Sequence, residues 1–249
     1  MKYKSYSKAI WDKIQEKLDH VLKTDSRPVA AFDADGTLWD TDLGENFFHY
    51  KIDNKLVKLP PNPWEHYQTL KKKNNDPRAA YLWLAQICAG QNIHTVKKWA
   101  DQAFKSIQPR PIFEDQQKLI QLLIEKGVQV FIVTASIKWA VEPGAVALGL
   151  KHENVIGIET QIEDDIVTDL QKGVITYREG KVQGLLEQTG NKYAFLVSGN
   201  TEGDLALLES AKDLRLVVSA AARDQELFHT EDKMQKLAAE RDWLHHRFV

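Results

Sequence analysis

The sequence contains one cysteine and no long apolar run, and both absences narrow the class of protein. Cys88 is the only cysteine among 249 residues, so an intrachain disulfide and a cysteine zinc site are excluded. The first twenty residues carry charges throughout and have no continuous apolar stretch. We therefore predict no signal peptide and no membrane-spanning segment, and expect the cytoplasm as the compartment.

An excess of charge of one sign is also missing. The 33 lysines and arginines stand against 35 aspartates and glutamates, a formal net charge of -2. This balance gives no electrostatic reason to expect nucleic acid or an anionic membrane as a partner. A hydrophobic content of 43% is ordinary for a globular protein. The length allows one large domain or a core domain with a smaller insertion, and no oligomeric state is predicted.

Short apolar runs alternate with amphipathic helical patterns, which predicts an α/β fold. Alternation of this kind is typical of a doubly wound, Rossmann-like parallel sheet covered by helices on both faces. The pair His245-His246 is interpreted as a solvated tail rather than a metal site. The expected strands are 29–32, 128–133, 154–158, 193–197 and 214–218, and the expected helices are 10–22, 114–126, 136–148, 203–211 and 231–240.

Residues 43–110 interrupt this alternation with a stretch rich in aromatic residues and lysine. Apolar residues recur there at helical spacing, prolines punctuate its beginning and end, and no strand pattern is visible. We therefore predict a mostly helical insertion at 43–110 and a core domain made of 1–42 and 111–249.

The strongest local signal is the run from Asp33 to Thr37, with the sequence Asp-Ala-Asp-Gly-Thr, directly after an apolar run. Ligands collect at the carboxyl ends of parallel strands, so this run lies where chemistry is expected. A carboxylate can take a phosphoryl group, and a second carboxyl group nearby can protonate the leaving oxygen and later deprotonate water. We therefore expect Asp33 as nucleophile and Asp35 as acid and base. The structural alternative is an acidic turn that caps a helix.

Three further segments place polar side chains near the same edge. The Thr134 hydroxyl can donate to a phosphate oxygen, and Ser136 follows closely. Lys181 can neutralise charge on a transferring group. Asn200 and Asp204 follow another apolar run on a loop whose side-chain oxygens suit magnesium. Each has an ordinary alternative: a helix cap for the hydroxyls, a solvated lysine, and a capped loop.

Together these segments resemble the haloacid dehalogenase superfamily of phosphohydrolases, over most of the chain outside 43–110. The resemblance implies a phosphatase that acts on a small phosphate ester through an aspartyl phosphate and needs Mg2+. The implied roles are nucleophile for Asp33, acid/base for Asp35, phosphate contacts for Thr134 and Lys181, and metal binding by Asp33, the Asp35 carbonyl, Asn200 and Asp204.

The phosphoserine-phosphatase-like branch is the most similar, because its helical cap lies between the first and second motifs. That similarity implies that Asp42, with Glu45 nearby, faces a cationic group of the substrate and that Arg78 holds a carboxylate. Phosphoserine, phosphoethanolamine and phosphocholine are then candidate substrates, and a sugar phosphate or nucleotide remains an alternative. Asn200 departs from the usual aspartate of the fourth motif. One negative charge is gone, and weaker magnesium binding is expected.

Several alternatives stay open on the sequence alone. A dehalogenase shares the fold, but Asp35 favours phosphate chemistry. A phosphotransferase or mutase would use the same Asp33 intermediate, and a catalytically silent binding module would keep only the fold. Trp39 is predicted to pack in the core, although with Phe47, Phe48 or Tyr50 it would also suit a quaternary ammonium group.

Overall fold

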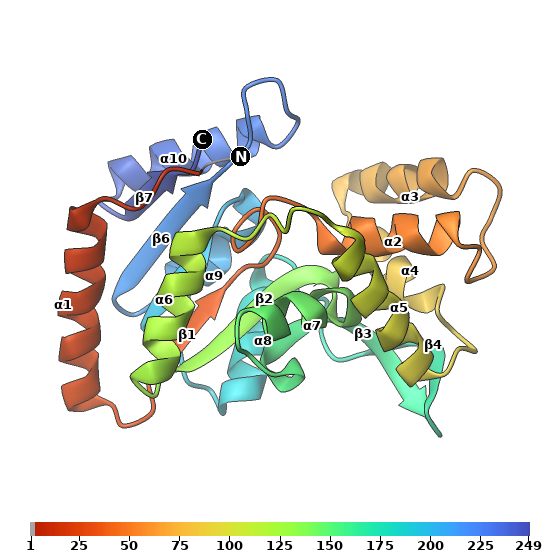
Figure 1. The fold of residues 1–249 in the computed structure, drawn as a ribbon, viewed down its shortest axis with the longest axis horizontal. Helices are drawn as coiled ribbons and strands as arrows, with labels where there is room; N and C mark the ends of the chain where they lie inside the picture. The colour runs from red at the N-terminus through yellow and green to blue at the C-terminus, as the bar shows by residue number, and fades with distance from the viewer. Residues whose placement is uncertain (1–2) are drawn as a thin grey trace.

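The computed structural model describes residues 3–249 and is built around a seven-stranded sheet with the order β4-β3-β2-β1-β5-β6-β7 (Figure 1). The strands are β1 (Val29–Phe32), β2 (Gln129–Ile137), β3 (Val155–Glu163), β4 (Ile166–Lys172), β5 (Leu196–Gly199), β6 (Leu214–Ser219) and β7 (Leu244–Arg247). Neighbouring strands are parallel except β3 and β4, which pair antiparallel. The predicted doubly wound parallel sheet is therefore confirmed.

Helices cover both faces of this sheet. One face carries α1 (Lys8–Thr24), α6 (Glu114–Glu125) and α7 (Lys138–Ala147), and the other carries α8 (Glu179–Thr189), α9 (Leu205–Ser210) and α10 (Phe228–Glu240). The central strands are apolar on both faces, because each face is covered by helices. Successive side chains of β1 illustrate this. Val29 and Ala31 pack with the second group of helices, whereas Ala30 and Phe32 pack with the first.

The segment 43–110, between β1 and α6, is mostly helical, as predicted, and lies beside one end of the sheet (Figure 1). Its hydrophobic cluster includes Phe48 and Leu84 and extends to Trp139 of α7. The helices therefore share packing with the core, and their division from it as a separate domain remains a prediction. They are α2 (Leu43–Asp53), α3 (Pro63–Lys72), α4 (Arg78–Gln86) and α5 (Ile93–Ser106).

The chain enters and leaves this helical segment at the same place. The Asp40 N–H donates to the Pro111 carbonyl at 2.9 Å, and the Phe113 N–H donates to the Leu38 carbonyl at 3.0 Å. These two bonds hold the connecting segments side by side. No helix within residues 3–249 combines the length and the apolar character needed to cross a membrane.

Several features differ from the sequence prediction. Strand β4 was not predicted; its residues alternate weakly, and Val167 is its one buried residue. Strand β2 continues past Val133 to Ile137, so Thr134 and Ser136 lie on the strand rather than at the start of a helix. The interpretation of His245-His246 as a solvated tail is wrong, because both residues belong to β7, which pairs with β6, and His246 packs edge-to-face on Tyr6.

Candidate active site

A cleft of about 820 Å³ lies at the carboxyl ends of β1, β2 and β5, between the sheet and the helices α3 and α4. The strand ends, where the fold predicts a ligand site, supply the two carboxylates Asp33 and Asp35, the hydroxyl of Thr134 and the amide of Asn200 to its lining. Nine of the ten candidate residues predicted from the sequence line this cleft: Asp33, Asp35, Asp42, Glu45, Thr134, Ser136, Lys181, Asn200 and Asp204.

Asp33, Lys181 and Asp204 form a buried ion cluster. The Lys181 ammonium lies 2.5 Å from Asp33 Oδ1 and 2.6 Å from Asp204 Oδ1. Burial and the Asp204 carboxylate raise the pKa of Asp33 to about 7, against the opposing effect of Lys181. Burial alone would lower the pKa of Lys181, but the two carboxylates outweigh it and raise that pKa above its ordinary value. The lysine is therefore a fixed cation beside Asp33.

Gly36 lets the loop after β1 approach the loop after β5, and Gly199 lets the loop after β5 fold back on itself. Gly36 has φ +76, and a Cβ there would lie 2.1 Å from Asn200 Nδ2. A Cβ at Gly199 would lie 2.7 Å from the Cβ of Asp204. Asp204 Oδ2 in turn accepts the N–H groups of Asn200 at 3.1 Å and Thr201 at 2.9 Å, which closes the loop after β5. The motif glycines are thus required by close packing as well as by the turn.

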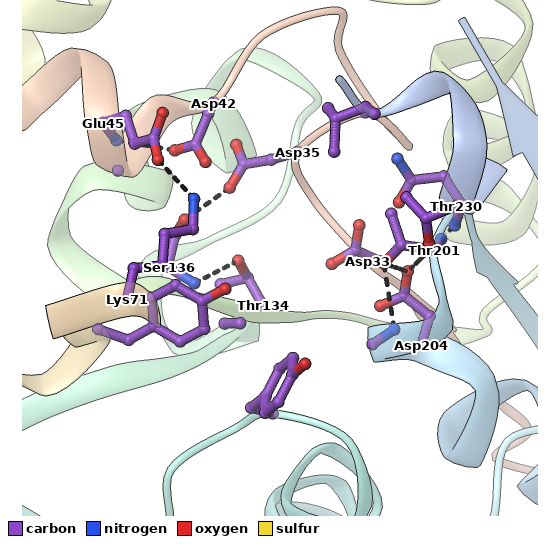
Figure 2. Close-up of a pocket in the computed structure, with 18 of the residues that line it drawn as sticks. Asp33, Asp35, Asp42, Glu45, Lys71, Thr134, Ser136, Thr201, Asp204 and Thr230 are labelled. Atoms are coloured by element: carbon purple, nitrogen blue, oxygen red, sulfur yellow. Dashed lines mark hydrogen bonds and ion pairs between the residues drawn. The ribbon is translucent and has the colours of Figure 1, made fainter. Parts of the chain in front are cut away.

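Asp35 has different neighbours, although only one residue separates it from Asp33. Its Oδ1 accepts the Trp39 indole N–H at 2.8 Å and the Leu43 backbone N–H at 2.9 Å. Its Oδ2 accepts the Ser136 hydroxyl at 2.6 Å, a contact visible in Figure 2. Burial raises the pKa of Asp35 above its ordinary value, and these hydrogen bonds only partly offset it. Because Oδ1 already accepts two N–H groups, a proton on this carboxyl belongs on Oδ2.

Thr134 is almost fully buried and faces the same space. Its hydroxyl oxygen accepts the Ser136 N–H at 3.0 Å, and its carbonyl accepts the Thr176 hydroxyl at 2.5 Å. The hydroxyl hydrogen of Thr134 has no acceptor among these contacts, so it is free to bind a phosphate oxygen in the cleft.

The wall formed by α2, α3 and α4 carries both acidic and aromatic groups. Glu45 Oε1 accepts from the Lys71 ammonium at 2.9 Å and from the Tyr67 hydroxyl at 3.3 Å. The same ammonium lies 5.6 Å from the centre of the Tyr67 ring. Asp42 caps α2 by accepting the Glu45 N–H at 2.7 Å, and burial, followed by the charges of Asp35 and Glu45, raises its pKa well above the ordinary value. Figure 2 shows Asp42 and Glu45 beside Asp35.

Arg78 is the one candidate residue that the structure does not bring into this cleft. Its guanidinium is exposed and forms a two-pronged ion pair with Asp76, with contacts of 2.7–2.9 Å. It lines a smaller cavity beside Tyr177 and Arg178. The position was carried over by approximate spacing, and the loop 73–77 turns the arginine away from the cleft.

The structure adds residues that sequence reasoning did not place. Trp39 packs in the core as predicted, but its indole also holds Asp35. Phe47 and Phe48 are buried among the helices, and the aromatic rings that line the cleft include Trp64, Tyr67 and Tyr81. The only signal for them was helical periodicity, which does not say which face is turned to the site. Glu231 of α10 also lines the cleft, and nothing in its local sequence distinguishes it.

The oxygen atoms at the ends of β1 and β5 fit a hard cation. Asn200 Oδ1, on a side chain 1% exposed, lies 3.3 Å from the Thr37 hydroxyl oxygen, whose single hydrogen has a closer acceptor in Asp33 Oδ2 at 3.0 Å. The amide oxygen therefore lacks a full donor and is available to a metal ion, next to the Asp33 carboxylate. Within residues 3–249, no three His, Cys, Asp or Glu side chains converge to hold one without help. The amide oxygen and backbone groups would have to contribute.

Comparison with known proteins assigns the family. The pattern of the haloacid dehalogenase-like hydrolases matches residues 30–209, more than half of the chain. The chain belongs to the haloacid dehalogenase-like hydrolase family. The match runs from β1 to α9, so it includes all the strand ends at the cleft and leaves out α10.

The individual relatives of this chain have low sequence identity to it. Phosphorylcholine phosphatase from Pseudomonas aeruginosa is 23% identical over 190 residues, which cover 61% of this chain and 54% of that protein. The chain therefore spans about half the length of this curated relative.

Solved structures share the fold at low identity. A conserved protein of unknown function from Anaerococcus prevotii has a TM-score of 0.74 at 15% identity, covering 98% of this chain and 95% of that one. A phosphoserine phosphohydrolase-like protein from Francisella tularensis has a TM-score of 0.57 at 16% identity, with 89% and 96% covered. These similarities extend through both the sheet and the helical segment.

Proposed function

We propose that this hydrolase is a magnesium-dependent phosphomonoesterase in which Asp33 is the nucleophile and Asp35 the proton donor and acceptor. The observation that carries the proposal is the unequal environment of the two carboxyl groups. Burial raises the pKa of both carboxyl groups. Asp33, however, contacts the fixed cation Lys181, which favours its carboxylate, whereas Asp35 is held only by three neutral hydrogen-bond donors. One carboxyl is thus suited to attack and the other to carry a proton.

The ion that the family implies would be held by Asp33, the Asp35 carbonyl and Asn200, with Asp204 nearby. When bound, Mg2+ would supply positive charge that relieves repulsion between the Asp33 carboxylate and the phosphate oxygens. Lys181 contributes a second positive charge beside Asp33, and the Thr134 hydroxyl donates to one phosphate oxygen.

The reaction then proceeds in two displacements. An oxygen of Asp33 attacks phosphorus in line with the ester oxygen, the bond between phosphorus and the ester oxygen breaks, and the leaving oxygen takes the proton from Asp35 Oδ2. This leaves an aspartyl phosphate at Asp33 and a carboxylate at Asp35. Asp35 next takes a proton from water as the water oxygen attacks phosphorus, which releases phosphate and restores both groups.

The substrate we infer is a small ester whose leaving group carries an ammonium charge. The Lys71 ammonium already lies against the Glu45 carboxylate and over the Tyr67 ring, which is the contact set that binds an alkylammonium group. Asp42 lies between this corner and Asp35. The name of the Pseudomonas aeruginosa relative agrees with such a substrate. Phosphoserine, phosphoethanolamine and phosphocholine are the candidates to test.

The first experiment measures phosphate release from p-nitrophenyl phosphate with magnesium and with EDTA. It compares the native chain, Asp33→Asn, and the control Asp40→Asn, which removes a carboxylate from the same cleft outside the Lys181 cluster. We expect magnesium-dependent turnover that Asp33→Asn abolishes and the control retains. Full activity in Asp33→Asn would contradict the proposal.

Two further assays define the reaction and the substrate. Adding an amino alcohol as acceptor distinguishes hydrolysis from phosphotransfer, because a transferase would form a new ester at the expense of free phosphate. Comparing phosphocholine with 3,3-dimethylbutyl phosphate, its uncharged analogue of the same shape, isolates the ammonium charge. Equal kcat/KM for the two esters would exclude the proposed cationic subsite.

A further inference from the structure

The side-chain amide of Asn200 is held by a buried carboxylate from the far end of the chain. Asn200 Nδ2 donates to Glu231 Oε1 at 3.0 Å, and Glu231 Oε2 accepts the N–H groups of Ala220 at 3.0 Å and Ala221 at 2.8 Å. Glu231 is 1% exposed and lies on α10, outside the part of the chain that matches the family. It is therefore a hydrogen-bonded carboxylate directly behind a proposed metal ligand.

We propose that Glu231 is a positioning residue for the metal site: it fixes the Asn200 amide so that Oδ1 faces the cation, and it supplies the negative charge that Asn200 lacks. The inference rests on the proposed function, because it assigns Glu231 a role at the same magnesium site. It also replaces the sequence expectation that the missing charge is simply lost. The negative charge is instead carried by Glu231, which lies behind Asn200 as seen from the ion.

The orientation follows from the chemistry of the amide. An asparagine side chain presents donors at Nδ2 and acceptors at Oδ1, whereas a carboxylate only accepts. Glu231 therefore selects Nδ2, and the oxygen is turned toward Thr37 and Asp33. The flipped amide would set Oδ1 against the buried carboxylate. Partners behind a metal ligand commonly fix its orientation in this way.

Substituting either Asn200 or Glu231 alone should weaken magnesium binding, whereas substituting both together should not. Asn200→Asp places a second buried carboxylate against Glu231 with no hydrogen between them. Glu231→Gln still accepts the backbone N–H groups but turns its own amide N–H toward Asn200 Nδ2, so Asn200 must flip and direct nitrogen at the metal site. In the double variant the introduced glutamine amide donates to one oxygen of the introduced aspartate, and the other aspartate oxygen faces the ion.

The test is a double-mutant cycle read by magnesium binding rather than by turnover. Isothermal titration calorimetry gives the Kd for Mg2+ of the native chain, Glu231→Gln, Asn200→Asp and the double variant, and thermal melts with EDTA give their metal-free stability. The control Glu226→Gln removes an exposed carboxylate that lines the same cleft without belonging to the Asn200–Glu231 pair.

We expect each single exchange to raise the Kd at least tenfold, the double variant to return within about threefold of the native value, and Glu226→Gln to stay within about twofold. A native Kd in Glu231→Gln, with only a lower melting temperature, would overturn the proposal and leave Glu231 as a tie between α10 and residues 220–221. A double variant as weak as the two single effects combined would also overturn it. A native chain that binds no Mg2+ would instead overturn the proposed function.

Discussion

The two walls of the cleft differ in how tightly their charged groups are held. On the sheet side, Lys181 and Asp204 have side chains only 2% exposed, and each makes two or more polar contacts. On the helical side, Lys71 is 35% and Glu45 is 24% exposed, and the pair is joined by a single ion-pair contact. The first wall is rigid by burial, whereas the second can exchange its partners with solvent or a ligand.

Under the proposed function, this difference would separate the groups that act at phosphorus from the groups that select the substrate. A group that stabilises a transition state works best when it is already fixed, because no reorganisation is then needed during the reaction. A group that recognises a leaving group must release its resting partner when the substrate arrives. Substitutions in the fixed wall should therefore reduce turnover more than substitutions in the adaptable wall.

The largest effect is expected for Lys181→Met. Removing the ammonium leaves the Asp33 and Asp204 carboxylates buried without their shared cation, which costs about 3–5 kcal/mol of unfolding free energy in EDTA. Turnover of p-nitrophenyl phosphate should fall roughly a thousandfold or more. Denaturant unfolding and steady-state kinetics measure both effects. Lys71→Met removes a partly exposed lysine from the helical wall and serves as the control. This variant should unfold at the same denaturant concentration as the native chain.

A smaller loss is expected for Ser136→Ala, which removes the hydroxyl that donates to Asp35 Oδ2. This donor favours the carboxylate, so its loss should raise the pKa of Asp35 further and shift the pH–rate profile to higher pH. We expect kcat for an alkyl phosphate to fall roughly tenfold, with a smaller change for p-nitrophenyl phosphate, whose leaving group needs no proton. Ser210→Ala, on α9, is the matched control, and an unshifted profile would contradict the assignment of Asp35.

On the adaptable wall, Lys71→Met should improve binding of a cationic substrate. The ammonium of Lys71 competes for Glu45 and the Tyr67 ring, so its removal should lower the KM for phosphocholine by roughly three- to tenfold, about 1 kcal/mol. The KM for 3,3-dimethylbutyl phosphate should not change. Lys72→Met, which removes a neighbouring charge that also lines the cleft, is the control. A higher KM for both esters would mean that Lys71 itself binds the substrate.

The smallest effect on turnover is expected for Lys51→Met, behind the helical wall. Lys51 is fully buried, and its ammonium contacts the Leu84 carbonyl, Cys88 Sγ and the Phe47 ring. We expect the methionine variant to be more stable at pH 7 by roughly 1–2 kcal/mol, with unchanged kcat. Chemical denaturation measures the first quantity.

The sign of the pH dependence gives a second test of Lys51. Burial lowers the pKa of Lys51 below its ordinary value of 10.5. The unfolded chain therefore binds the proton more tightly, and native stability should rise as pH increases from the lowered pKa toward 10.5. The advantage of Lys51→Met should shrink over the same range. An advantage independent of pH would show that the methionine acts through packing alone.

The sequence was most informative for elements that short apolar runs and helical spacing determine. The strand-end residues Asp33, Asp35, Thr134 and Asn200 were predicted to lie together because parallel strands bring their carboxyl ends to one edge, and the structure places them in one cleft. The sheet and its flanking helices followed from apolar runs and helical spacing. These are short-range patterns, which a single sequence records directly.

The features that were missed depend on long-range packing. Glu231 reaches Asn200 across 31 residues. Arg78 is a different case, because its partner Asp76 is only two residues away and the prediction rested on its distance from the first motif alone. Strand β7 carries the sequence Leu-His-His-Arg, which has no apolar run, and it forms because β6 offers it an open edge. No periodicity in the local sequence indicates any of these contacts.

The hydrogen-bonded connections at Leu38–Asp40 and Pro111–Phe113 make the segment between them exchangeable as a unit. Because the segment 43–110 leaves and re-enters through two stretches that are hydrogen-bonded to each other, a foreign helical segment could be spliced in at two adjacent points. The residues at the strand ends would stay in place while the helical wall of the cleft, formed by α2, α3 and α4, is exchanged. The graft would have to supply a new apolar face for Trp139, since this residue packs into the native segment.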